Sequence, residues 1–147
     1  MTVMVRARRT RTVRRRWWSL MALVSVLPVM ASCASLGPDP VTAGTTAAAF
    51  HRAITDRDGA AACALLAPET LAEVEQTTGD SCDQAILTQD LPDAQSVQDS
   101  QAFGRGAQVV LDGDVLFLAV FDGQWRVTAA GCEPDGNRPY DCTVKGS

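Results

Sequence analysis

The residue with the clearest capacity for acid–base chemistry is His51, the one histidine in the sequence. Histidine serves as a general acid or base when a carboxylate lies within reach. The nearest carboxylates in sequence, Asp56 and Asp58, miss the i+3 and i+4 spacing that would place them on the same helical face. His51 is therefore interpreted either as a base at the mouth of a pocket or as a rim or surface residue. We assign no catalytic residue.

Motifs for nucleophilic, phosphate or metal chemistry are missing from the sequence. It contains no Gly-x-Ser-x-Gly, no glycine-rich phosphate loop and no His-Glu-x-x-His. The aspartates of LDGDVL and FDGQW are assigned to turns, where aspartate is favoured for backbone reasons. We therefore predict neither a metal nor a cofactor.

Four cysteines lie in the second part of the chain, at Cys63, Cys82, Cys132 and Cys142. An even number in an exported chain predicts two disulfides. Three pairings are compatible with the sequence. We favour Cys63 with Cys82 and Cys132 with Cys142, because each pair falls within one local structural unit. A zinc site is the alternative, but no pair has the Cys-x-x-Cys spacing of a structural site.

The N-terminus has the pattern of an export signal. Seven arginines fall between residues 6 and 16, and the next fourteen residues, WWSLMALVSVLPVM, carry no charge. Fourteen helical residues rise only about 21 Å, less than the roughly 30 Å hydrocarbon core, so a permanent transmembrane anchor is disfavoured. Whether export follows the general secretory or the twin-arginine route stays open.

Cys33 ends the stretch VMASC, which resembles the lipobox of bacterial lipoproteins. The resemblance implies that residues 1–32 are a signal peptide and that Cys33 becomes the lipidated first residue of the mature chain. Two or three acyl chains, palmitate among them, would hold the protein at the extracytoplasmic side of the cell membrane, since one chain binds only marginally. The alternative is an ordinary signal peptide cleaved near Ala31 or Ala34.

Residues 33–44 are predicted to form the lipidated end and a flexible tether, because prolines and glycines interrupt them without apolar periodicity. Residues 45–147 are predicted to form one domain. All seventeen acidic residues but only six basic ones follow Cys33, a net charge of −11. A surface this acidic repels phosphate backbones, so we predict no nucleic-acid partner.

The predicted secondary structure changes from helices to strands near residue 94. Before it, the segments 45–59, 60–68, 68–79 and 81–92 have helical patterns with caps at Thr45 or Thr46 and at Ser81. After it, period-two patterns predict strands, and Asp112-Gly113 and Asp122-Gly123 predict hairpins. Two-residue turns would pair Val109 with Leu116, Val120 with Trp125 and Leu116 with Ala129. They would place one apolar set on the helix side: Val109, Leu111, Leu116, Leu118, Val120, Trp125 and Val127.

The opposite face of the predicted sheet is too apolar for a purely solvated surface. It includes Val110, Val115, Phe117 and Phe121. Either the disulfide-closed tail CEPDGNRPYDC covers this face, or the face contacts a partner or a second copy of the chain. Trp125 and Phe117 could also line a pocket, with core packing as the alternative.

The pieces AAAFHRAITDRDGAAACALLAPET, GDSCDQAI and GQWRVTAAGCEPDGNRPYDC resemble a group of uncharacterised actinobacterial lipoproteins with an NTF2-like, cone-shaped α+β domain. The resemblance implies three to four N-terminal helices packed on a curved antiparallel sheet of about four strands. It implies a location in the cell envelope and carries no activity, because this fold hosts enzymes and binding modules alike.

The function predicted from these observations is a membrane-tethered extracytoplasmic lipoprotein that acts as a non-enzymatic binding or accessory module. Its expected partners are the membrane, through the lipid anchor, and an envelope protein or a second copy of the chain. The alternatives are a small NTF2-like hydrolase or isomerase that uses His51, and a passive carrier of a small apolar ligand.

Overall fold

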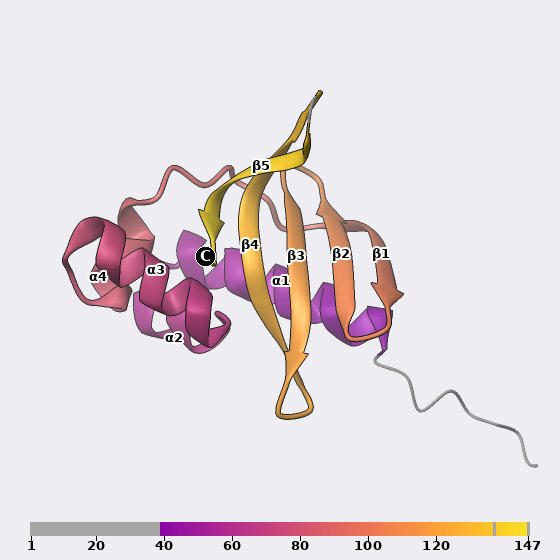
Figure 1. The fold of residues 1–147 in the computed structure, drawn as a ribbon, viewed down its shortest axis with the longest axis horizontal. Helices are drawn as coiled ribbons and strands as arrows, with labels where there is room; N and C mark the ends of the chain where they lie inside the picture. Colours follow the sequence, from indigo (N-terminus) through magenta and orange to yellow (C-terminus); the bar gives the residue numbers. More distant parts are fainter. Residues whose placement is uncertain (1–38, 137, 147) are drawn as a thin grey trace, which may run out of the picture. The chain divides into compact units, whose positions relative to one another are not determined.

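A computed structural model describes residues 39–136 and 138–146 (Figure 1). This part of the chain is α+β: four α-helices and one 3-10 helix come first, and five antiparallel strands follow in the spatial order β1-β2-β3-β4-β5. The elements are α1 (Pro40–Thr55), α2 (Gly59–Ala64), α3 (Pro68–Thr78), α4 (Cys82–Ala85), η1 (Ile86–Thr88), β1 (Val97–Phe103), β2 (Gly106–Leu111), β3 (Val115–Phe121), β4 (Gln124–Asp135) and β5 (Arg138–Lys145).

The helix α1 begins earlier than the sequence pattern predicts. Asp39 is its N-cap and accepts a hydrogen bond from the Val41 amide, and Pro40 occupies the first helical position. An acidic cap followed by proline is a strong start signal, because the cap satisfies a free amide and proline lacks one. Residues 40–44, predicted as part of the tether, are therefore helical, and the predicted cap at Thr45 or Thr46 is wrong. Cys33 lies outside the described residues.

The short helices α2, α3 and α4 form a group beside the β4 side of the sheet in Figure 1. The predicted disulfide between Cys63 and Cys82 is confirmed, and it joins α2 to α4. Gly59 begins α2 where the two helices meet: a β-carbon there would lie 1.8 Å from the Asp83 carbonyl oxygen. Only glycine permits this approach.

Both predicted hairpins are present. Asp122 and Gly123 have φ values of 49° and 78°, as a two-residue hairpin turn of the primed type requires. The predicted pairing of Val109 with Leu116 and of Val120 with Trp125 is confirmed. The predicted pairing of Leu116 with Ala129 is wrong, because an irregularity beside Leu118 places Ala129 opposite Phe117.

The tail CEPDGNRPYDC, one of the two alternatives for covering the opposite face, forms the fifth strand of the sheet. In β4 and β5, Cys132 lies opposite Cys142, and the predicted disulfide between them is confirmed. The prediction of about four strands therefore falls one short. The Cys132–Cys142 disulfide and the backbone hydrogen bonds between β4 and β5 reinforce each other, because both hold these two strands in register.

The core lies between α1 and the sheet, with Ala47 and Phe50 fully buried on the helix side. The predicted inward set is buried: Val109, Leu111, Leu116, Leu118, Trp125 and Val127 are at most 6% exposed, and Val120 packs against them partly buried. No helix among residues 39–136 and 138–146 is long and apolar enough to span a membrane.

Candidate functional site

His51 lies in the interior, so its interpretation as a rim or surface residue is wrong. Its exposed fraction is 1%, and its ring packs edge-on against Phe50 with the ring centroids 5.6 Å apart. The reason is the position of α1, which runs along the sheet and contacts β1, β2, β3 and β4. A helix enclosed in this way buries a wider arc than one apolar stripe, and the residue next to Phe50 falls inside it.

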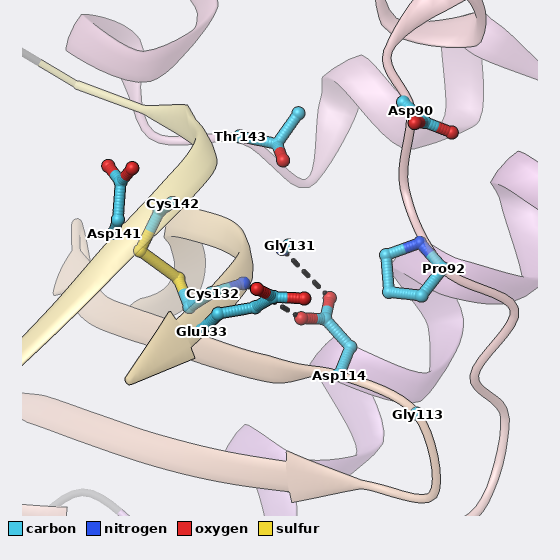
Figure 2. A pocket seen from close by; sticks show the side chains of 10 residues that line it. All are labelled: Asp90, Pro92, Gly113, Asp114, Gly131, Cys132, Glu133, Asp141, Cys142 and Thr143. Atoms are coloured by element: carbon cyan, nitrogen blue, oxygen red, sulfur yellow. Dashed lines mark hydrogen bonds between the residues drawn. A yellow bond between two sulfur atoms is a disulfide. The ribbon is translucent and has the colours of Figure 1, made fainter. Parts of the chain in front are cut away.

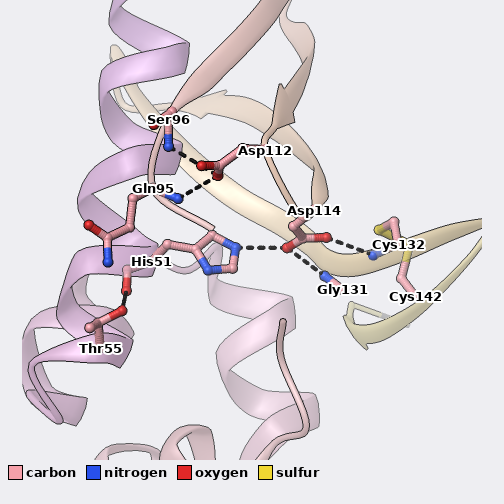
Figure 3. A network of polar contacts seen from close by, with 9 residues as sticks. All are labelled: His51, Thr55, Gln95, Ser96, Asp112, Asp114, Gly131, Cys132 and Cys142. Atoms are coloured by element: carbon pink, nitrogen blue, oxygen red, sulfur yellow. Dashed lines mark hydrogen bonds and ion pairs between the residues drawn. A yellow bond between two sulfur atoms is a disulfide. The ribbon is translucent and has the colours of Figure 1, made fainter. Parts of the chain in front are cut away.

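The partner of His51 is Asp114, which directly precedes β3. The imidazole Nε2 lies 2.7 Å from the Asp114 Oδ2 atom (Figure 3), and the aspartate is 6% exposed. The amides of Gly131 and Cys132 donate to the two oxygens of the same carboxylate at 3.0 Å each. Gly131 has a φ of 64°, and a left-handed residue turns successive amides toward one side, which suits an anion.

The two amide hydrogen bonds to Asp114 indicate which atom is the donor in the hydrogen bond between His51 and Asp114. Each oxygen of the Asp114 carboxylate accepts one amide hydrogen bond, and a carboxylate oxygen accepts rather than donates. Nε2 of His51 is then the third donor. The pair connects α1 to the start of β3, and the two amides connect the same carboxylate to β4. Its geometry therefore fits a buried structural junction between three elements.

The aspartates closest to His51 in sequence do not approach it in this way. The Asp58 carboxylate caps α2 by accepting the Ala61 amide, and Asp56 is the C-cap residue of α1. Asp114 was not predicted as a partner of His51, because the aspartates of LDGDVL were assigned to a turn. Strand alternation carried the missing signal, since Asp114 has the same parity as the inward residues Leu116 and Leu118.

The turn residue Asp112 has a separate structural role. Its Oδ1 atom accepts the amides of Gln95 and Ser96 at 2.8 and 3.2 Å, and its own amide donates to the Ser96 carbonyl (Figure 3). The bond from the Gln95 amide, followed by that from Ser96, lowers the pKa of the Asp112 carboxyl from its usual value of 3.8. The carboxylate thereby attaches the segment before β1 to the hairpin between β2 and β3.

A cavity of about 420 Å³ lies beside Asp114 at the end of the sheet where β4 and β5 meet (Figure 2). Four carboxylates and the second disulfide line it, whereas His51 does not: the lining residues are Asp90, Pro92, Gly113, Asp114, Gly131, Cys132, Glu133, Asp141, Cys142 and Thr143. Such walls favour cations over anions. Among the described residues, no group of three or more histidine, cysteine or acidic side chains is placed to hold a metal ion.

The sheet face opposite the helices is partly covered by the chain itself. Tyr140 of β5 packs edge-on against Phe117, with the ring centroids 5.0 Å apart, and its hydroxyl accepts a hydrogen bond from Gln108 at 2.8 Å. The four residues of the predicted contact surface are all partly buried: Val110, Val115, Phe117 and Phe121. We call these four residues the outer face. Figure 1 shows the helices behind and beside the sheet, away from this face.

The two aromatic residues considered as pocket residues both pack elsewhere. Trp125 is 6% exposed in the core, and its indole nitrogen donates to the Asp39 carbonyl oxygen at 3.1 Å. Phe117 belongs to the outer face. Neither lines the cavity beside Asp114.

Comparisons of this chain with protein-family models, with curated proteins and with solved structures found no match.

Proposed function

We propose that this chain is a lipoprotein that is tethered at Cys33 to the extracytoplasmic side of the cell membrane. We further propose that its domain is NTF2-like and acts as a non-enzymatic binding or accessory module for an envelope protein or for a second copy of itself. The export signal and the lipobox-like VMASC support the location. The two disulfides support it too, because such bonds persist in oxidising compartments outside the cytoplasm.

The observation that carries the binding role is the outer face. Its four large apolar residues remain partly exposed, and the only ring contact that covers them comes from Tyr140, against Phe117, among the residues the structure describes. Apolar side chains gathered on one side of a sheet, away from the helices, are typical of a protein–protein contact.

The two alternative functions have less support. A hydrolase or isomerase would need His51 to reach a substrate, whereas His51 is 1% exposed and its Nε2 atom is bound to Asp114. A carrier of an apolar ligand would need an enclosed apolar pocket, whereas four carboxylates line the cavity beside Asp114 and the apolar hollow between α1 and β1 is an open groove.

The contact is tested by crosslinking the full chain in its native membrane and identifying the products by mass spectrometry. Phe121→Asp should abolish crosslinks to the partner or to a second copy, because a charge on the outer face cannot be desolvated without a partner of opposite charge. Gln84→Asp, an exposed substitution on α4, is the matched control and should leave the crosslinks unchanged.

Two measurements make the result interpretable. Phe121→Asp should retain the circular dichroism and melting temperature of the parent; a strongly destabilised variant would show that the outer face belongs to the interior. Labelling with a clickable palmitate should mark the parent and not Cys33→Ala. Equal labelling of both would disprove the anchor, whatever the crosslinks show.

A further inference from the structure

A second hollow lies at the opposite edge of the sheet, between α1 and β1. It is a groove of about 490 Å³, lined by Pro40, Val41, Gly44, Thr45, Ala48, Ala49, Arg52, Val97 and Ser100. Ser100 donates from its hydroxyl to the Pro40 carbonyl oxygen at 2.6 Å, which fixes the start of α1 against β1. A β-carbon on Gly44 would lie 3.4 Å from the Val97 side chain, an ordinary van der Waals distance, so α1 and β1 pack closely beside the groove. We call it the α1–β1 groove.

Exposed apolar side chains gather along this edge. Among the described residues, three large apolar side chains are exposed: Val41 at 72%, Phe103 at 65% and Val97 at 42%. Val41 and Val97 line the α1–β1 groove, and Phe103 ends the same strand. This edge therefore carries all three of the large apolar side chains that are exposed among the described residues.

The charge of the groove differs from that of the rest of the domain. Arg52 is its one charged lining residue, whereas the cavity at the β4–β5 edge is lined by four carboxylates. The residues after Cys33 carry a net charge of −11. The lining of the groove thus offers a phosphate one cation and no carboxylate, while the Asp39 carboxylate caps α1 beside it. The Arg52 stem can lie along apolar surface while its head reaches a phosphate.

The covalent chain places this groove near the proposed anchor. Six residues, from Ala34 to Asp39, separate Cys33 from Pro40, the first residue that lines the groove. Even fully extended, this connection reaches only about 25 Å. Acyl chains attached to Cys33 would therefore keep the bilayer within that distance of the groove.

We propose that the α1–β1 groove is the surface with which the domain rests on the phospholipid bilayer. Val41 and Val97 contact acyl chains at the interface, and Arg52 contacts a lipid phosphate. This inference depends on the proposed lipid anchor and adds the orientation of the domain to it. The acidic β4–β5 edge then lies away from the anionic lipid surface, which would repel it.

The test uses the full, lipidated chain in vesicles of phosphatidylethanolamine and phosphatidylglycerol. The photoreactive residue p-benzoylphenylalanine replaces Val41 in one protein and Glu133, an exposed residue of β4, in the other. After irradiation, mass spectrometry should find at least about fivefold more phospholipid adduct at position 41 than at 133, because only the groove rests on lipid. Adding Arg52→Gln to the position-41 protein should reduce the adduct severalfold in these vesicles and much less in phosphatidylcholine.

Each other outcome overturns the proposal in a distinct way. Equal adduct at both positions, or adducts from position 41 to a second copy of the chain, would show that the groove is not a lipid contact. The mass of the N-terminal peptide is read in the same experiment. A Cys33 without acyl chains would remove the anchor and this orientation together, whereas an acylated Cys33 with no preference for position 41 would remove the orientation alone.

Discussion

At the residue scale, Asp114 and His51 show how this domain accommodates a buried carboxyl group. The aspartate is 6% exposed, and it accepts hydrogen bonds from two amides and the imidazole. A buried carboxylate is tolerated only when such partners replace water. Replacing one member of this cluster leaves buried polar groups without a hydrogen-bond partner. The resulting loss of folding free energy is larger than the net stabilisation that the intact pair provides.

Asp114→Ala should therefore lower the free energy of unfolding by about 3–5 kcal/mol. Asp114→Asn should cost less, because its amide oxygen still accepts one of the three hydrogen bonds. Urea unfolding followed by circular dichroism measures both. The double variant Asp114→Ala with His51→Leu should lose less than the two single losses combined, since the two residues share one interaction. Full additivity would show that the pair is not coupled.

At the element scale, residues of the β2–β3 turn bind a segment that lies outside the hydrogen-bonded strands. Asp112 accepts two amides from the segment before β1. Gly113 beside it allows a close approach: a β-carbon there would lie 2.4 Å from the Asp93 carbonyl oxygen. The β2–β3 turn therefore serves both as a hairpin and as the support of the segment that connects the helices to the sheet.

Asp112→Ala should destabilise the domain in a pH-dependent way. Amide hydrogen bonds lower the pKa of the folded Asp112 carboxyl, so its stabilising effect is present above the unfolded value of about 4 and is lost as the pH falls through the folded value. Urea midpoints of parent and variant should differ at pH 7 and converge below about pH 3. Asp112→Asn is the control, because it keeps an acceptor that does not titrate. A constant difference between parent and Asp112→Ala would contradict the assignment.

At the scale of the whole molecule, two disulfides support a small core. One joins α2 to α4 and the other joins β4 to β5, so one disulfide crosslinks the short helices and the other crosslinks the edge of the sheet. A domain of about 100 residues buries a modest share of its surface, which makes such bonds a large part of its stability.

Replacing both cysteines of either bridge with serine should lower the free energy of unfolding by roughly 2–4 kcal/mol. The Cys63/Cys82 variant should lose somewhat more in the loop-entropy description, because its bridge spans 19 residues and the other spans 10. Urea unfolding of the two double variants against the parent checks the ranking. Losses below about 0.5 kcal/mol would show that neither bridge constrains the unfolded chain.

The amino-acid pattern was enough to predict the α+β class, both hairpins and the inward apolar set, and it favoured the disulfide pairing that the structure shows. These depend on local patterns: strand alternation, Asp-Gly turns and the closeness of paired cysteines. Strand β5 and the start of α1 were misassigned, although Asp39-Pro40 carried a local signal for the helix start. The lipid anchor at Cys33 and the contact role of the outer face stay predictions.

The buried junction of His51 and Asp114, in contrast, depends on tertiary packing. His51 and Asp114 are 63 positions apart, and no local pattern relates them. They meet because α1 lies along the sheet and because Gly131 turns two amides toward the same carboxylate. The same packing brings Val41 beside Val97 in the α1–β1 groove. Contacts between distant segments depend on how whole elements pack, and neither composition nor spacing specifies that.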